Sequence, residues 1–299
     1  MSIPDPRNRD IVVFVNGELV PRTEAKVSVF DSSVQGGDAV WEGLRVYNGR
    51  IAALDGHLQR LQNSAKALLF ESVPSTDEVR DAIFKTLAAN GMRDESHIRL
   101  TLTRGEKITS GMNPRLNQSG CCLIVLAEWK PPVYSDDGIR VITASTRRNT
   151  PQCLDSKIHH SNLLNNILAS IEANVAGADS AIMLDIDGFV SETNDTNLFI
   201  VHDGEVLTPT ADSCLPGLTR QMILDICKEQ GIPAAERRLS MTEVYTADEV
   251  FTSGTMGELT PILEADGRVI GDGKPGDMTK RLQSLHREFA YEHGTPLPV

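Results

Sequence analysis

Hydrophobic and polar residues alternate along the start of the chain as they do in short antiparallel strands. Two such pairs of segments are separated by Asn16-Gly17 and by Asn48-Gly49. An Asn-Gly pair between alternating segments is a strong hairpin signal, because the favoured two-residue turn needs positive φ at both positions. The pattern therefore predicts two hairpins, formed by Ile11–Val15 with Glu18–Val20 and by Leu44–Tyr47 with Arg50–Ala53.

The hydrophobic period then lengthens from two residues to between three and four. Leucine and alanine recur at helical spacing from Leu58 to Leu69, which predicts a first helix. Apolar residues keep that spacing over Val79–Leu87, after the start signal Ser75-Thr76, and predict a second helix. Strand-like alternation then returns in two segments, Ile98–Thr103 and Cys121–Ala127.

The segment 128–137 has two prolines followed by polar residues and is the best candidate for a linker. We therefore expect an N-terminal α+β domain at 1–127 and a larger, strand-rich C-terminal domain at 138–299. The elements predicted beyond the linker are the strand Ile139–Ser145, the helix Asn162–Val175, hairpins of Ala181–Asp185 with Phe189–Ser191 and of Asn197–Val201 with Val206–Thr208, the helix Thr219–Gln230, the strand Glu249–Thr252 and a helix from Thr279 to Gly294. The predicted fold class is a two-domain protein of mixed α+β type.

Composition narrows the function classes. The 299 residues are 40% hydrophobic and carry a net charge of −12, which excludes a mainly disordered chain and a global basic field for nucleic acid. The sequence contains no run of about 18 apolar residues, so no membrane span is predicted. The charged start MSIPDPRNRD disfavours an export signal, and the five cysteines are an odd number with no CxxC pair. We expect reduced thiols and a cytoplasmic protein.

Four polar segments are candidates for chemistry: Leu154–Lys157, Ser191–Asn197, Leu215–Arg220 and Ser253–Glu258. Taken alone, each is most simply a turn or a cap. Together they offer a lysine for a Schiff base, a carboxylate for a pyridinium nitrogen, and a helix N-terminus for a phosphate, which are the requirements of pyridoxal phosphate (PLP). No metal site is expected, because the neighbouring His159 and His160 point apart on a strand or helix.

At this point the sequence resembles the class IV, fold-type IV PLP-dependent aminotransferases. The motifs that carry the resemblance occur in the family's order: Trp41-Glu42-Gly43-Leu44-Arg45, His57-Leu58-Gln59-Arg60-Leu61, Lys157, Glu192-Thr193-Asn194 with Asn197-Leu198-Phe199, Leu215-Pro216-Gly217-Leu218-Thr219-Arg220, and Ser253-Gly254-Thr255 with Glu258-Leu259-Thr260-Pro261. The resemblance runs from about Val13 to Glu288, which is nearly the whole chain.

The resemblance implies roles for individual residues. Lys157 would be the Schiff-base lysine, which also carries the proton between the substrate's α-carbon and the cofactor. Glu192 would pair with the ring nitrogen N1 and keep it protonated, and Asn197 would support Glu192. The remaining cofactor-binding residues, mainly around the phosphate, would be Arg60, Leu218, Thr219, Thr255 and Met256.

The motifs around the substrate combine features of two subgroups. Trp41–Arg45 and Gly111–Pro114 resemble branched-chain aminotransferases, whereas Gly37-Asp38 and Arg45–Gly49 resemble D-amino-acid aminotransferases. Gly36 and Leu163 stand where branched-chain enzymes usually have tyrosines. The candidate substrate-binding residues are Gly36, Trp41, Arg45, Arg99, Met112, Met256 and Gly257, with Arg104, Arg147 and Arg148 as further candidates for the substrate carboxylate.

The resulting hypothesis is a PLP aminotransferase that moves an amino group from an amino acid, first of all a branched-chain L-amino acid, to a 2-oxo acid by a ping-pong mechanism. D-amino-acid transamination, (R)-amine transamination and aminodeoxychorismate lyase activity remain alternatives on the same fold. A PLP-free binding protein is a further alternative, which the presence of both Lys157 and Glu192 disfavours. By resemblance we also expect a homodimer or a higher homo-oligomer.

Overall fold

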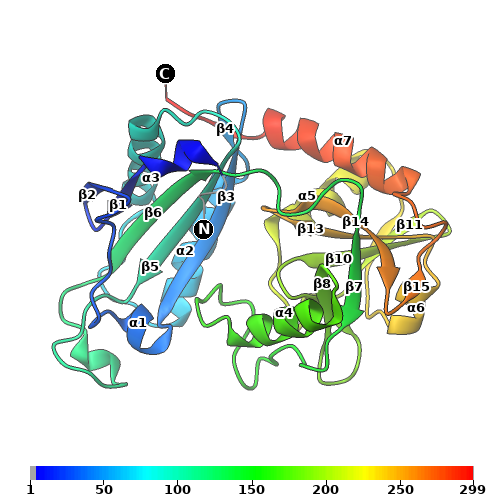
Figure 1. The fold of residues 1–299 in the computed structure, drawn as a ribbon, viewed down its shortest axis with the longest axis horizontal. Helices are drawn as coiled ribbons and strands as arrows, with labels where there is room; N and C mark the ends of the chain where they lie inside the picture. The colour runs from blue at the N-terminus through cyan, green and yellow to red at the C-terminus, as the bar shows by residue number, and fades with distance from the viewer. Residues whose placement is uncertain (1–4, 299) are drawn as a thin grey trace. The chain divides into compact units, whose positions relative to one another are not determined.

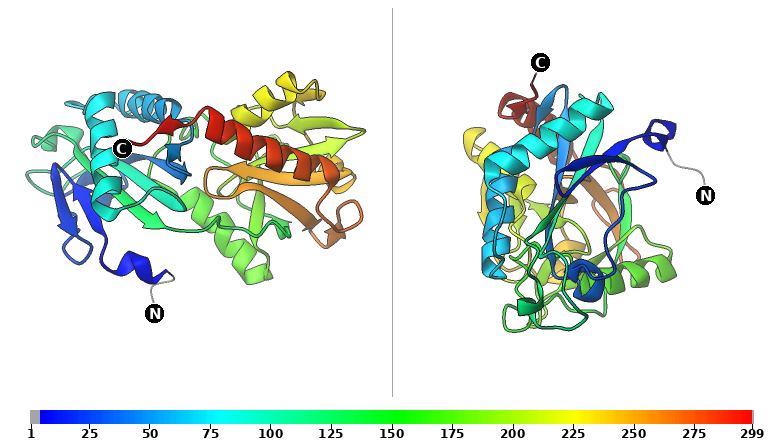
Figure 2. Two further views of the ribbon diagram at one scale, coloured as in Figure 1. Left: turned by 90° about the horizontal axis from the view of Figure 1, so that it is seen from above. Right: turned by 90° about the vertical axis from the view of Figure 1, so that its left-hand side faces the viewer.

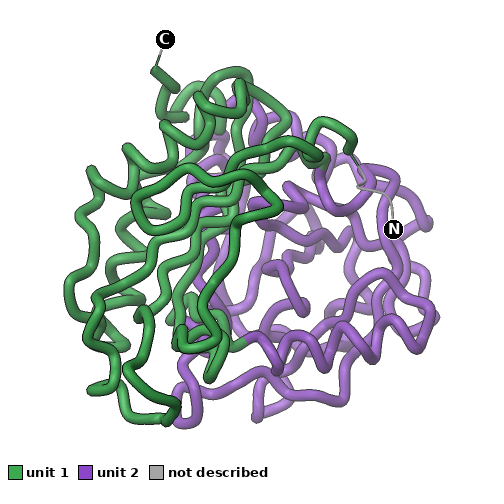
Figure 3. The backbone as a smooth tube through the Cα atoms, turned by 60° about the vertical axis from the view of Figure 1, so that its left-hand side comes forward, with its two compact units in different colours: residues 1–131, 158–162, 290–299 green, residues 132–157, 163–289 purple. Residues whose placement is uncertain are grey.

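The computed structural model describes residues 5–298, which form two compact units. Unit 1 comprises Met1–Pro131, Ile158–Asn162 and Ala290–Val299, and unit 2 comprises Pro132–Lys157 and Leu163–Phe289 (Figure 3). The chain passes from unit 1 to unit 2 after Pro131, inside the predicted linker at 128–137. The C-terminal domain is not continuous over 138–299 as expected, because residues 158–162 and 290–299 belong to unit 1. Residues 1–4, part of the stretch that disfavours an export signal, lie outside the described residues.

Unit 1 is built on an antiparallel sheet. Among the described residues its seven strands have the order β16-β4-β3-β5-β6-β1-β2 (Figure 1). The strands are β1 (Val12–Val15), β2 (Glu18–Pro21), β3 (Ala39–Tyr47), β4 (Arg50–Ile51), β5 (Ser96–Thr103), β6 (Cys122–Trp129) and β16 (Thr295–Pro296). The helices are η1 (Pro6–Arg9), α1 (Ser32–Gly36), α2 (Leu54–Ala67), α3 (Thr76–Asn90) and η2 (Pro114–Leu116). Figure 2 shows α2 and α3, blue to cyan, on the same side of this sheet.

The local signals in unit 1 act as the sequence predicts. Asn16-Gly17 and Asn48-Gly49 have positive φ at both positions and join β1 to β2 and β3 to β4. Ser75 and Glu78 form a reciprocal capping box at the start of α3, and Gly91 ends that helix with φ +66°. Both hairpins and both helices are therefore confirmed.

Unit 2 contains a larger, mixed sheet. Among the described residues it has nine strands in the order β12-β11-β10-β13-β14-β7-β8-β9, with β15 beside β14. The strands are β7 (Ile139–Thr143), β8 (Ser180–Leu184), β9 (Val190–Thr193), β10 (Asn197–His202), β11 (Glu205–Thr208), β12 (Ala234–Glu236), β13 (Glu249–Gly254), β14 (Glu258–Ala265) and β15 (Arg268–Val269). The helices are α4 (Leu164–Ala176), α5 (Leu218–Glu229), α6 (Met241–Tyr245) and α7 (Asp277–Glu292). In the described part of the chain, no helix is both long and apolar enough to cross a bilayer.

The central strands of unit 2 are buried on both faces. Along β10, Leu198 and Ile200 belong to one apolar cluster, while Phe199 and Val201 belong to another that includes residues of α5. Phe199 also stacks on Phe251 of β13, with ring centroids 5.0 Å apart. Burial on both faces accounts for the continuous apolar run Leu198–Val201, and the strand begins with the polar residue Asn197.

The sequence prediction lacks several elements of unit 2, among them β14, α6 and the short strands β12 and β15. Strand β14 contains Pro261, which lacks the N–H that a central strand normally uses, and the strand is irregular between Ile262 and Glu264. The five-residue helix α6 is too short to show a helical period. The strands and helices that the sequence does predict beyond residue 138 are present, with ends that differ by a few residues.

Candidate active site

The Glu192 carboxylate is buried in unit 2, on β9. Its Oε1 atom accepts a hydrogen bond from Arg148 Nε at 2.6 Å, and its Oε2 atom accepts one from Asn197 Nδ2 at 3.3 Å. Burial raises the pKa of Glu192, while the charge of Arg148 and its hydrogen bond oppose that rise. Glu192 is therefore an interior carboxylate with the charged side chain of Arg148 beside it.

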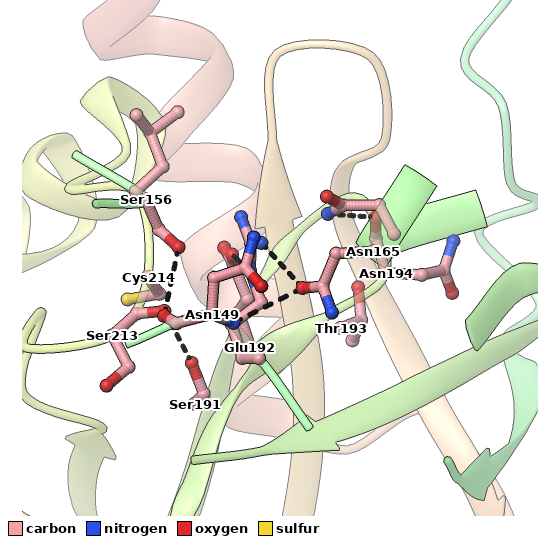
Figure 4. A network of polar contacts seen from close by, with 12 residues as sticks. Asn149, Ser156, Asn165, Ser191, Glu192, Thr193, Asn194, Ser213 and Cys214 are labelled. Atoms are coloured by element: carbon pink, nitrogen blue, oxygen red, sulfur yellow. Dashed lines mark hydrogen bonds and ion pairs between the residues drawn. The ribbon is translucent and has the colours of Figure 1, made fainter. Parts of the chain in front are cut away.

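Asn197 joins Glu192 to the turn that precedes α5. Its Nδ2 atom also donates to the backbone oxygen of Leu215 at 3.0 Å. Two further contacts tie the same turn to the site: Ser191 Oγ donates to the backbone oxygen of Ser213 at 3.1 Å, and Lys157 Nζ to that of Asp212 at 3.4 Å. The turn 212–217 thus contacts two of the other segments that the sequence singles out, Leu154–Lys157 and Ser191–Asn197. Figure 4 shows the contact between Ser191 and Ser213.

The start of α5 is a free helix N-terminus. Its N-cap residue is Gly217, and no side chain among the described residues caps it. Leu218 and Thr219 are the first two helical residues, and Thr219 is buried. Backbone N–H groups in the first turn of a helix lack partners within the helix and can bind an anion.

Lys157 lies in a turn of the long segment between β7 and α4. Its side chain is exposed, and the 3.4 Å contact with Asp212 is a weak one. The backbone N–H of Lys157 donates to Asp155 Oδ1 at 3.0 Å, which fixes the turn. The backbone of Lys157 is therefore fixed, while its amine is exposed and makes only this weak contact.

The loop between β13 and β14 carries Thr255, Met256 and Gly257. The backbone oxygen of Met256 accepts a hydrogen bond from the N–H of Val133 at 2.9 Å. In the sheet, Asn197 stands opposite Ser253, so this loop starts beside the strand that supports Glu192. Unit 2 thus contains Lys157, Glu192, Asn197, Leu218 and Thr219 together with the loop residues.

Arg60 lies in unit 1, where it pairs with a buried carboxylate. Its Nε and Nη2 atoms donate to the two oxygens of Glu42 at 2.9 and 2.7 Å, and His57 Nδ1 lies 2.7 Å from Glu42 Oε2. His159 Nδ1 lies 3.1 Å from Glu42 Oε1, an ion-pair distance outside hydrogen-bond geometry. Burial favours a raised pKa for Glu42, but its contacts with His159, Arg60 and His57 hold the pKa well below the ordinary value of 4.5.

Three candidate substrate residues share one face of the sheet in unit 1. Trp41 and Arg45 alternate on β3, and Arg99 on β5 stands opposite Gly43 between them. The Arg99 guanidinium lies 3.4 Å from the centroid of the Trp41 ring. Burial lowers the pKa of Arg99 to about 10, so it stays charged at neutral pH.

Arg45 also contacts the backbone, because its Nη1 atom donates to the backbone oxygen of Lys130 at 3.1 Å. The other candidates are less closely grouped. Gly36 is the last residue of α1, and Met112 lies in a loop with 95% of its surface exposed. Arg104 pairs with Asp38, with Nε 2.6 Å from Oδ2.

The partner of Glu192 was not predicted from the sequence, in which Arg147 and Arg148 are equal candidates for the substrate carboxylate. In the structure Arg148 is buried against Glu192, whereas Arg147 Nη1 donates to backbone oxygens of Ala144 and Ser145. Two adjacent arginines carry no signal in a single sequence that would separate these environments.

The sequence and the fold match a known protein class. The sequence model of the amino-transferase class IV family matches residues 39–265. The chain belongs to the class IV aminotransferase family.

Relatives and solved structures agree with that assignment. The chain is 59% identical over 299 residues to branched-chain-amino-acid aminotransferase-like protein 2 of Arabidopsis thaliana, covering 100% of this chain but 54% of that protein. It is 40% identical over 283 residues to the putative branched-chain-amino-acid aminotransferase of Methanocaldococcus jannaschii, covering 94% and 97% of the two chains. The branched-chain amino acid aminotransferase from T.th., complexed with N-(5'-phosphopyridoxyl)-L-glutamate, matches with a TM-score of 0.88 and 35% identity over 95% of each chain. The two-domain fold-type IV architecture is therefore confirmed, and the chain spans about half the length of the Arabidopsis relative.

Proposed function

We propose that the protein is a PLP-dependent transaminase that moves an amino group between an amino acid, first of all a branched-chain L-amino acid, and a 2-oxo acid. The observation that carries this proposal is the connection made by Asn197. One amide links the buried carboxylate of Glu192 to the turn that opens α5, and the same turn contacts Lys157. A ring-nitrogen partner, a phosphate-binding helix start and an amine are thereby tied to one segment.

The residues of unit 2 fit this cofactor. Glu192 is a buried acceptor for a protonated ring nitrogen, and the uncapped first turn of α5 suits a phosphate. The hydroxyl of Ser253, next to Gly254-Thr255, is buried without a hydrogen-bond partner among the described residues. Lys157, Glu192, Asn197, Leu218, Thr219, Thr255 and Met256 would hold the cofactor, with Arg60 as a further phosphate ligand on the strength of the family motif.

PLP supplies an electron sink that stabilises negative charge on the carbon next to the amino group. The chain's own residues would do the rest. Lys157, whose backbone is fixed by a turn, would take and return the proton of the substrate's α-carbon through Nζ. Glu192 would hold the proton on the ring nitrogen, because a buried carboxylate stabilises a neighbouring cation more strongly than water does.

For the substrate side we propose Gly36, Trp41, Arg45, Arg99, Met112, Met256 and Gly257. The stacked pair of Arg99 and Trp41 supports this, because it offers a cation for a carboxylate next to an apolar ring. The relatives and solved structures with branched-chain aminotransferase names favour branched-chain L-amino acids as donors. D-amino acids remain the second candidate, because Gly36 leaves open space where branched-chain enzymes usually have a tyrosine.

We also propose that the chain works as a homodimer or higher homo-oligomer in a reducing compartment such as the cytoplasm. All five cysteines are free thiols. Helix α4 exposes an apolar stripe at helical spacing, formed by Leu164, Ile167, Leu168, Ile171 and Val175. Light scattering of wild type and Ile171→Asp tests the first part: the variant should have the smaller mass, and a monomeric wild type would contradict it.

The decisive experiment compares donors under matched conditions. The absorbance of the bound cofactor is followed after adding L-leucine, L-alanine, D-alanine or (R)-phenylethylamine to the loaded protein. L-leucine should react fastest, with an advantage over L-alanine of about 1–3 kcal/mol from its buried side chain. Rapid reaction with D-alanine or the amine, and none with L-leucine, would replace the branched-chain assignment. No PLP binding at all would overturn the transaminase proposal.

A further inference from the structure

Arg148 is held on three sides behind Glu192. Its Nε atom donates to Glu192 Oε1 at 2.6 Å, its Nη1 atom to Asn165 Oδ1 on α4 at 3.0 Å, and its backbone N–H to the oxygen of Leu184 on β8 at 2.8 Å. Only 6% of its surface is exposed. The Asn165 amide also accepts from the N–H of Asn149 (Figure 4) and donates to the backbone oxygen of Arg147. The guanidinium is therefore fixed in place before any ligand binds.

The charges around Glu192 make Arg148 important for its ionisation. Burial opposes the charged form of Glu192, and so does Asp195 in the turn after β9. Asn197 Nδ2 on β10 and the backbone N–H of Leu215 stabilise it as neutral donors. Cys214, from the turn before α5, lies near both Glu192 and Arg148, and burial raises the pKa of this thiol, so it remains neutral. Arg148 supplies the positive charge that pairs directly with Glu192.

We propose that Arg148 is a positioning residue that holds Glu192 ionised in the cofactor-free protein, so that an arriving ring nitrogen meets a carboxylate rather than a carboxylic acid. The role of this charge toward the ring nitrogen rests on the proposed function, but the ionisation of Glu192 itself is a property of the cofactor-free protein. An isolated buried carboxyl reaches a pKa of about 8–9 and is neutral at pH 7, because the interior cannot solvate its charge. A guanidinium stays charged and matches a carboxylate in shape, so it can hold the proton off.

The test measures protonation in the cofactor-free protein by infrared spectroscopy at pH 7. Arg148→Met should add the carbonyl stretch of one protonated carboxylic acid, with the proton taken from solvent, and this band should vanish in Arg148→Met/Glu192→Gln. Arg148→Lys should restore the ionised form at least in part, because it keeps the charge. Arg147→Met is the matched control, since its guanidinium contacts backbone oxygens rather than Glu192, and should show no new band.

A second readout uses proton uptake when PLP binds. Calorimetry in buffers of different ionisation enthalpy counts the protons taken up per site. Arg148→Met should take up about one proton fewer than wild type, because Glu192 already carries it. A purely structural defect would lower the PLP affinity without changing that count.

The outcomes separate this inference from the proposed function. An unchanged infrared spectrum in folded Arg148→Met overturns the inference, even if PLP binds and transamination proceeds. The new band together with no PLP binding by wild type supports the role of Arg148 and contradicts the proposed function. If circular dichroism shows that Arg148→Met does not fold, Asn165→Ala provides the test. This variant keeps both charges but removes a contact that holds the guanidinium, so the midpoint of the Glu192 titration should rise. An unchanged midpoint overturns the inference.

Discussion

The side-chain oxygen of Asn197 lies 2.1 Å from the point where a Cβ atom on Gly217 would stand. Gly217 is the N-cap of α5, and its φ of −64° is open to any residue, so the position requires glycine for space rather than for backbone conformation. The start of α5 therefore approaches the strand that supports Glu192 as closely as a bare backbone allows.

Gly217→Ala should displace either the start of α5 or Asn197. We expect a loss of stability of about 1–3 kcal/mol, the usual cost of overpacking, together with weaker PLP binding. Thermal unfolding and a PLP titration measure both effects. The double variant Gly217→Ala/Asn197→Ala removes the clash and should be no less stable than Asn197→Ala alone. Additive losses would show that Asn197 is not what the new methyl group meets.

Lys157→Ala should abolish transamination and leave the fold intact. The side chain is exposed and makes one weak contact, so stability should change by no more than about 0.5 kcal/mol. After borohydride reduction with PLP, wild type should gain the mass of one attached cofactor and the variant none. Lys274→Ala, which removes another exposed lysine of unit 2, is the control and should behave as wild type. Near-normal turnover by Lys157→Ala would exclude Lys157 as the catalytic amine.

Glu192→Gln should retain PLP but react slowly. The amide keeps the shape and loses the charge opposite the ring nitrogen, which costs about 2–4 kcal/mol of transition-state stabilisation, or roughly 30- to 1,000-fold in kcat. Single-turnover kinetics with an amino donor measure the chemical step. Glu205→Gln, an exposed carboxylate on β11, is the control. An unchanged single-turnover rate contradicts the assigned role.

Glu42→Gln should destabilise unit 1 in a pH-dependent manner. Arg60 is the permanently charged partner of Glu42, because burial lowers the pKa of His159 to about 4. Breaking a buried pair by neutralising one partner costs about 3–5 kcal/mol. The folded-state pKa of Glu42 is depressed, so its contribution is fully present above the ordinary value of 4.5 and is lost as pH falls through the folded pKa.

Urea unfolding of wild type and Glu42→Gln between pH 7 and pH 3.5 measures this difference. The gap between the two proteins should be constant down to about pH 5 and then shrink. Glu18→Gln, an exposed carboxylate on β2, corrects for general acid effects. If the difference in unfolding free energy stays constant to the lowest pH, the charge of Glu42 is not what stabilises its contacts with Arg60, His57 and His159.

Local signals predicted the local elements of the fold. The two Asn-Gly turns and the Ser75 cap act over a few residues, so the sequence displays them directly. Strand β14 forms a hairpin with the neighbouring β13, but it also pairs with β7, more than a hundred residues earlier, and Pro261 interrupts its pattern. A local window contains only one of these two partners and shows a disrupted strand signal.

The site divides in the same manner. The order of motifs identified Lys157 and Glu192, because each stands in a distinctive local sequence. The pairing of Arg148 with Glu192 spans 44 residues and depends on which of two adjacent arginines turns inward. Similarly, residues 158–162 belong to unit 1 through contacts that include a bridge between Val40 and His160, which neither segment reveals by itself.

Because β16 lies near the C-terminal end of the described residues, the two sheets are completed at different times during synthesis. Residues 295–296 form β16, which pairs with β4. The outer edge of β4 therefore has no neighbour while the ribosome makes the 243 residues between Ile51 and Thr295 (294 − 51 = 243). All strands of the sheet in unit 2 have been made by residue 269. Unit 1 therefore begins first and is completed last, and its nascent sheet carries an unprotected edge, the kind of surface that recruits chaperones or mispairs, throughout the translation of unit 2.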